Sequence, residues 1–157
     1  MASITPTRRV LVAGLALTGL GLGPARAATD VTVYKDPECG CCGGWAKHLR
    51  AAGFAVTERP VADLAAVKAR AGVPEALQSC HTAFVDGYVL EGHVPVEAVQ
   101  RLLRERPAVV GLAVPGMPIG SPGMEGPDPE PYDVMAFAKS GTPSVFLSVR
   151  PASGRGL

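Results

Sequence analysis

The sequence predicts an α/β fold in which helices flank a central mixed β-sheet, together with a C-terminal loop rich in proline, glycine and methionine. Three observations lead to this prediction. Between residues 31 and 106, short β-branched runs alternate with segments whose apolar residues recur at helical spacing. Asp86-Gly87 is a two-residue turn of the kind that joins antiparallel strands. The segment 115–131 contains six prolines and four glycines, which exclude a helix or a central strand there.

The first half of this pattern alternates strand and helix twice. Residues 31–34 are β-branched and apolar and predict the first strand. A helix follows over 45–52, where apolar residues recur at i, i+4 and i+7, and the apolar run 54–57 predicts the second strand. Asp63 is placed to cap a second helix, which Gly72 ends.

The second half begins with a hairpin and closes the sheet. Residues 82–85 and 88–90 are its two strands, and a helix follows over 95–106, opened by a proline and ended by arginines. The resulting order β, α, β, α, β, β, α is, among small domains, the thioredoxin-like arrangement. The run 144–149 predicts one further strand after the proline-rich loop.

Residues 1–27 have the three parts of a cleaved export signal. Arg8 and Arg9 form the basic part, Val10–Gly23 is apolar, and Ala-Arg-Ala at 25–27 suits a signal peptidase. The apolar run is shorter than the roughly 20 residues that span a bilayer, so we expect a periplasmic protein without a membrane anchor after cleavage. The adjacent arginines also fit the twin-arginine pattern, so Sec and Tat export both stay open.

The composition predicts one folded domain with no affinity for nucleic acid. The 157-residue chain is 47% apolar and 18% charged, and we expect a single domain over 28–150 and a flexible tail over 151–157. The formal net charge is +1, and removal of the leader's three arginines leaves acidic residues in slight excess. Binding of DNA or RNA is therefore excluded.

Three of the four cysteines lie in Cys39-Gly40-Cys41-Cys42, at the turn between the first strand and the first helix. The free N–H groups and positive dipole of a helix N-terminus stabilise thiolates. Thiolates attack disulfides and also bind soft metals. The C-x-x-C spacing of Cys39 and Cys42 occurs in redox enzymes and in metal sites, so spacing alone does not separate the two.

Cys80 favours a metal site. In a thioredoxin-like fold, the segment that leads into the third strand lies against the C-x-x-C turn, and thiol oxidoreductases place a proline there. This chain has Cys80 and His81 instead; because successive strand residues point to opposite faces, we expect Cys80 and not His81 to face the cluster. Thiolates and thioethers are the ligands that Cu(I) prefers, which makes Met117 and Met124 of the loop candidates.

At this point the sequence resembles a known family, the CopG-like periplasmic copper-resistance proteins of the domain-of-unknown-function 411 class. The resemblance covers nearly all of the chain after the leader and rests on blocks that occur in order: Tyr34-Lys35 before Cys39–Cys42, then Ser79–Thr82, Glu91–Pro95, Gly111–Pro118 and Gly120–Glu125. It implies a thioredoxin-like fold, a periplasmic location, copper bound by cysteines with help from methionine or histidine, and a role in copper tolerance. The metal ligands expected on both grounds are Cys39, Cys41, Cys42, Cys80, Met117, Met124 and His93.

The leading hypothesis is a periplasmic copper-binding protein of copper resistance. Three or four thiolates exceed the two needed for linear Cu(I), which favours a multinuclear copper-thiolate cluster with Cu(I)/Cu(II) redox activity. Copper ions are then the ligand, and periplasmic copper-handling proteins are the expected partners. The alternative is a thiol-disulfide oxidoreductase in which Cys39 attacks and Cys42 resolves. A zinc site and a purely structural disulfide, Cys39 to Cys42 or either to Cys80, also stay open.

Overall fold

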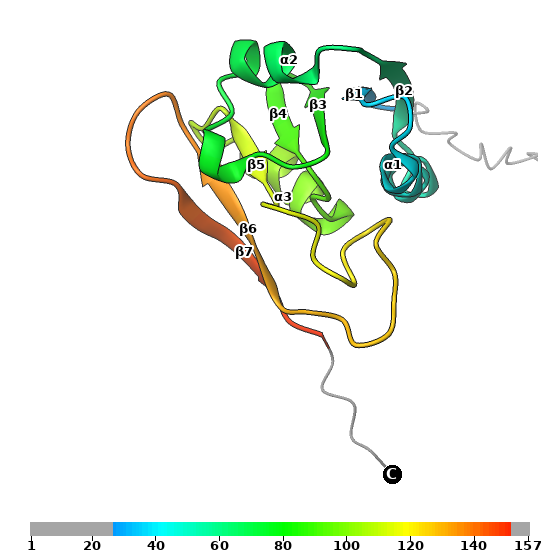
Figure 1. Cartoon of the computed structure of the whole chain (residues 1–157). Helices are drawn as coiled ribbons and strands as arrows, with labels where there is room; N and C mark the ends of the chain where they lie inside the picture. Colours follow the sequence, from blue (N-terminus) through cyan, green and yellow to red (C-terminus); the bar gives the residue numbers. More distant parts are fainter. Residues whose placement is uncertain (1–26, 152–157) are drawn as a thin grey trace, which may run out of the picture.

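The computed structural model describes residues 27–151, which form a seven-stranded mixed sheet with helices on both faces (Figure 1). The predicted signal peptide over 1–27 and the predicted tail over 151–157 lie outside the described residues, apart from one residue of each, and stay predictions. No helix of the described part is long and apolar enough to cross a membrane. The strands are β1 Asp30–Lys35, β2 Ala55–Pro60, β3 His81–Val85, β4 Tyr88–Glu91, β5 Gly111–Ala113, β6 Tyr132–Phe137 and β7 Ser144–Val149.

The three predicted α-helices are present, although the first begins at Gly40 and not at residue 45, and a short 3₁₀ helix was not predicted. They are α1 Gly40–Ala51, α2 Leu64–Ala71, the short 3₁₀ helix η1 Glu75–Leu77, and α3 Val96–Glu105. The Asp63 side chain caps α2 by accepting a hydrogen bond from the Ala66 N–H at 2.9 Å, and Gly72 ends it with φ +70°. The predicted α/β class, with a central mixed sheet flanked by helices, is confirmed.

The sheet has the order β2-β1-β3-β4-β5-β6-β7. Strand β2 is parallel to β1, β3 is antiparallel to β1, and β4 is antiparallel to β3. Strands β5 and β6 are not among the predicted strands, and they carry the sheet from β4 to the predicted final strand β7. Between β5 and β6, the proline-rich segment forms turns but no helix or strand, as predicted.

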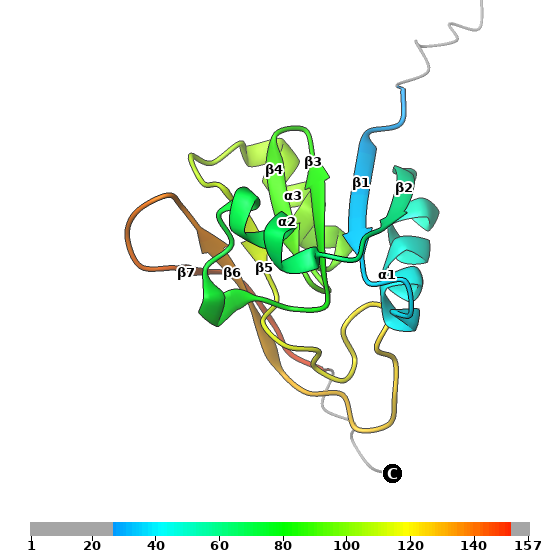
Figure 2. The same ribbon diagram turned by 45° about the horizontal axis from the view of Figure 1, so that its top comes forward.

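Each face of the sheet has its own hydrophobic core. Helices α1 and α3 cover one face and α2 covers the other (Figure 2). In register across the first face lie Val33, Ala83, Leu90 and Leu112, which belong to one cluster with Trp45 of α1. The second face has a smaller cluster, formed by Val73, Leu77, Val89, Ala113 and Phe137. Because β1 is an interior strand that pairs with β2 on one side and β3 on the other, the start of the turn that follows it is held in place.

Candidate metal centre

Three cysteines lie at the N-terminus of α1: Cys39 is the residue before the helix, and Cys41 and Cys42 belong to its first turn. The Asp36 carbonyl accepts a hydrogen bond from the Cys39 N–H at 3.1 Å, and α1 begins directly after Cys39. Cys42 is fully buried, whereas Cys39 and Cys41 are half-buried. Lys35 donates to the Cys39 carbonyl at 3.1 Å, which adds a positive charge to the positive end of the helix.

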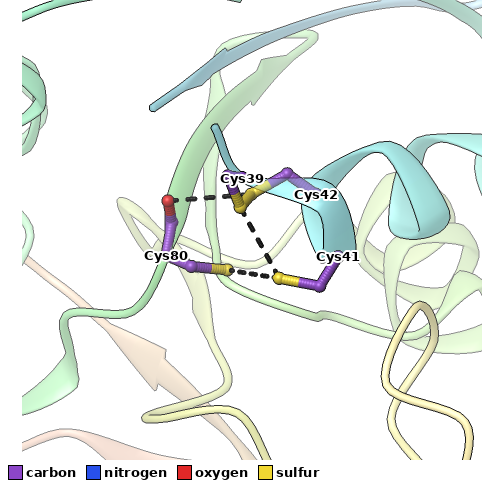
Figure 3. Close-up of side chains that lie close together, drawn as sticks. All are labelled: Cys39, Cys41, Cys42 and Cys80. Carbon is purple, nitrogen blue, oxygen red and sulfur yellow. Dashed lines mark hydrogen bonds between the residues drawn. A yellow bond between two sulfur atoms is a disulfide. The ribbon is translucent and has the colours of Figure 1, made fainter. Parts of the chain in front are cut away.

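The four cysteines come together in one group, which we call the four-cysteine cluster: Cys39, Cys41, Cys42 and Cys80 (Figure 3). Cys39 and Cys42 form a disulfide. The Cys41 sulfur lies 3.5 Å from the Cys39 sulfur and 3.9 Å from the Cys80 sulfur. All four sulfurs lie within 4.8 Å of one another. The sequence therefore predicts correctly that Cys80 meets the turn, although it lies 38 residues beyond Cys42.

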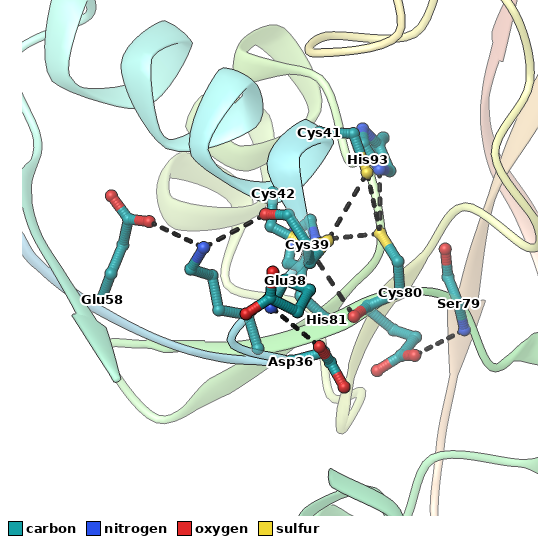
Figure 4. Close-up of a disulfide and its surroundings, with 12 residues drawn as sticks. Asp36, Glu38, Cys39, Cys41, Cys42, Glu58, Ser79, Cys80, His81 and His93 are labelled. Atoms are coloured by element: carbon teal, nitrogen blue, oxygen red, sulfur yellow. Dashed lines mark hydrogen bonds and ion pairs between the residues drawn. A yellow bond between two sulfur atoms is a disulfide. The ribbon is translucent and has the colours of Figure 1, made fainter. Parts of the chain in front are cut away.

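Cys80 also belongs to a second donor group, with two histidines. Its sulfur lies 2.9 Å from His93 Nε2 and 3.3 Å from His81 Nδ1, and these atoms too lie within 4.8 Å of one another (Figure 4). Both imidazoles are fully buried. The segment that precedes β3 thus carries one sulfur shared by an all-sulfur group and a sulfur-nitrogen group.

The hydrogen bonds assign one tautomer to His93. Its Nδ1 donates to the Pro122 carbonyl at 2.7 Å, so in the neutral ring the Nε2 lone pair faces the Cys80 thiol. Burial lowers the pKa of His93 and lowers that of His81 well below its ordinary value, so both rings are neutral near pH 7. Burial, and next the charge of Cys41, raises the pKa of Cys80 to about 12. The Cys80 thiol therefore donates to His93, and a metal that binds there displaces that proton.

Cys80 and not His81 belongs to the four-cysteine cluster, as expected, but the His81 ring also lies beside the Cys80 sulfur. Strand alternation does not apply to the pair, because β3 begins at His81 and Cys80 lies before it. The His81 ring stacks on Trp45 with centroids 4.4 Å apart, and its Nε2 has no hydrogen-bond partner. The Trp45 indole N–H donates to the Val94 carbonyl at 2.8 Å, so Trp45 packs beside both histidines from α1. Sequence reasoning missed His81 as a site residue, although its position beside Cys80 indicates one.

The proline-rich loop closes against the first turn of α1. A Cβ on Gly123 would lie 2.6 Å from the Cys41 carbonyl oxygen and 2.5 Å from the backbone nitrogen of Trp45, so only glycine permits this close approach of the loop to the helix. The predicted ligand Met124 adjoins Gly123 and is half-buried, whereas Met117 is 50% exposed. The loop therefore brings Met124 to the neighbourhood of the cluster, and the ligand roles of both methionines stay predictions.

Comparisons with known proteins agree with this geometry. A family model described as "Protein of unknown function, DUF411" matches residues 77–124, which include Cys80, both buried histidines and most of the loop. Two solved structures match over 78% of this chain. "Copper resistance protein copG- Form 2" is 48% identical with 99% of that chain covered and a TM-score of 0.75. "Copper resistance protein copG- Form 1" is 49% identical with 98% covered and a TM-score of 0.74. No curated protein matches the chain.

Proposed function

The chain belongs to the family of the copper resistance protein CopG, and on this premise we propose that it is a periplasmic copper-binding protein of copper resistance. The observation that carries the proposal is the gathering of four sulfurs within 4.8 Å of one another, with two neutral imidazoles beside one of them. Thiolates suit Cu(I), and imidazole suits copper in either oxidation state. The donor set therefore fits copper.

Two donor groups that share Cys80 support the binding of more than one copper. The all-sulfur group offers four ligands once its disulfide is reduced, and the second group adds His81 and His93. A sulfur that belongs to both groups is suited to bridge metals, which favours a multinuclear site. The Cu(I)/Cu(II) couple is the chemistry that the metal supplies when bound. Met124, and Met117 after movement of the loop, are proposed as thioether ligands.

We also propose a thioredoxin-like class for the first four strands and an exported mature chain. The order β2-β1-β3-β4 supports the class, with β2 parallel and β3 antiparallel to β1, and with a cysteine turn after β1. The predicted leader over 1–27 supports export by Sec or Tat. Periplasmic copper-handling proteins are the proposed partners.

The test is copper content per chain, by elemental analysis of the mature protein after anaerobic reduction, copper loading and desalting. We expect two or more coppers per chain in the reduced wild type and fewer in the Cys39→Ser, Cys42→Ser double variant. The oxidised wild type is the matched control, since its Cys39–Cys42 disulfide removes two thiolates without any mutation. Reduced protein that retains no copper would overturn the proposal.

A second candidate function is thiol-disulfide exchange, because the disulfide itself lies at a helix N-terminus. In this mechanism Cys39, which is half-buried, attacks the substrate, and the fully buried Cys42 resolves the mixed disulfide. Insulin reduction separates the two functions: turnover that persists after metal removal and disappears in Cys39→Ser would favour the enzyme. The position of Cys80, where such enzymes have a proline, argues for copper.

A further inference from the structure

A buried ion pair lies behind the metal-binding segment, on the face of the sheet that α2 covers. Glu91 of β4 is fully buried and Lys68 of α2 is 5% exposed, and Lys68 Nζ lies 2.5 Å from Glu91 Oε1. Neither residue belongs to the two donor groups. Buried pairs of opposite charge contribute little to stability, because desolvation of the charges offsets their attraction. The pair therefore calls for an explanation other than stability.

The hydrogen bonds of Glu91 identify what the pair holds. Its carboxylate accepts from the Ser79 N–H at 2.6 Å and from the Thr82 hydroxyl at 2.7 Å. Ser79 and Thr82 are the residues on either side of Cys80 and His81. Lys68 donates to the Thr82 hydroxyl oxygen as well, at 3.2 Å, so all three groups are fixed together. One carboxylate thus holds both ends of the segment that carries a predicted ligand and its neighbouring imidazole.

The same residue also fixes that segment relative to His93. Glu91 is followed directly by Gly92, whose N–H donates to the His81 carbonyl at 2.9 Å, and then by His93. Glu91 therefore ties the backbone on each side of Cys80 to the strand end from which His93 extends. The 2.9 Å separation of Cys80 Sγ and His93 Nε2 depends on this connection. Hydrogen-bonded groups behind metal ligands commonly orient them and raise their affinity.

We propose that Lys68 and Glu91 are a positioning pair that holds Cys80, His81 and His93 in the geometry needed to bind metal. The inference rests on the proposed function as a copper-binding site and adds two residues that do not touch the metal. It explains why a fully buried carboxylate on β4 is satisfied by one ammonium, one backbone N–H and one hydroxyl.

The test compares two double variants. Lys68→Met with Glu91→Leu removes both charges and both hydrogen-bond acceptors and fills the space with apolar groups, so neither charge is left buried without its partner. Lys68→Met with Glu91→Gln also removes the charges, yet leaves a side-chain oxygen that can accept from the Ser79 N–H. Cu(I) affinity is measured on reduced protein by competition with a chromophoric chelator, and thermal unfolding of the copper-free protein is measured in parallel.

We expect the Leu variant to bind Cu(I) about 10- to 100-fold more weakly. It should also unfold at a lower temperature than the wild type, because the Ser79 N–H and the buried Thr82 hydroxyl lose their acceptor. The Gln variant should lose less affinity than the Leu variant, because it retains an acceptor for the Ser79 N–H. It should still lose more than about threefold, because Lys68 no longer fixes Thr82 and residue 91. A Leu variant whose affinity stays within about threefold of wild type would overturn the proposal. If that variant fails to fold, the same comparison is made with the Gln variant, for which an unchanged affinity has the same meaning.

A measurement without copper separates this inference from the proposed function. Alkylation of Cys80 relative to Cys41 is followed by mass spectrometry in the metal-free, reduced protein. Release of the segment should speed the reaction of Cys80 and leave Cys41, which lies on α1, unchanged. If the wild type binds no copper, the proposed function fails and the alkylation ratio still decides on positioning. An unchanged ratio in the Leu variant would refute it.

Discussion

Replacement of Gly123 by alanine should detach the proline-rich loop from the metal centre. Gly123 has φ +89°, which costs an alanine about 1–2 kcal/mol. The new Cβ would also lie 2.5 Å from the Trp45 nitrogen and 2.6 Å from the Cys41 carbonyl oxygen, which are backbone atoms of α1 and have little freedom to move. Overpacking of this kind costs about 1–3 kcal/mol, so we expect a total loss of about 3 kcal/mol in the free energy of unfolding.

Gly141→Ala is the matched control for this variant. Gly141 has φ +96°, and a Cβ built on it would meet no atom within 4 Å. Both substitutions restrict the unfolded chain equally. The difference between the two variants in the free energy of unfolding, measured in urea, therefore reports the contact with α1 alone. Gly123→Ala should also weaken Cu(I) binding about tenfold, because the adjacent Pro122 carbonyl orients His93. Equal losses of stability and unchanged copper affinity in the two variants would refute the reasoning.

Three further predictions concern single residues. Cys80→Ser should lower the copper content more than Cys41→Ser does, because Cys80 is shared by both donor groups and Cys41 belongs to one; equal losses by elemental analysis would contradict this. Copper should quench the emission of Trp45, the only tryptophan, because its ring stacks on His81; an unchanged spectrum during titration would place the metal elsewhere. Burial, and next the charge of Glu97, raises the pKa of Tyr132 to about 12. The unfolded chain therefore loses this proton first, and stability should fall as pH rises from about 10 to 12, less so in Tyr132→Phe.

The sequence was sufficient to predict the meeting of the four cysteines because it depends on topology and not on fine packing. The order of strands and helices places the turn after β1 beside the start of β3, and this needs only the periodicity of each segment. Strand β5 escaped prediction because it has three residues, all buried, with no alternation to read. The backbone of β5 is extended because it pairs with β4 on one side and β6 on the other. The residues of β5 alone do not indicate this pairing.

The histidines and the ion pair show a second limit of sequence reasoning. The position of His81 beside the Cys80 sulfur was not predicted, because the alternation rule was extended one residue beyond the strand. Lys68 and Glu91 look like ordinary surface charges in the sequence, since they lie 23 residues apart on different elements. Only the packing of α2 on β3 and β4 shows that they meet, and only their burial shows that the meeting is unusual.

The disulfide and the copper site draw on the same sulfur atoms, so the two states of the protein exclude each other in part. Cys39 and Cys42 bind a metal only as thiolates, and their disulfide withdraws both from the four-cysteine cluster. Cys80, His81 and His93 do not take part in that disulfide, and in the oxidised chain their donor atoms lie within 4.8 Å of one another. The redox state of Cys39 and Cys42 therefore sets how many ligands the site offers. The positioning pair of Lys68 and Glu91 holds the other group of ligands, Cys80, His81 and His93, in either state. If the proposed function holds, the affinity of the chain for metal should therefore follow the supply of thiol reductant around it.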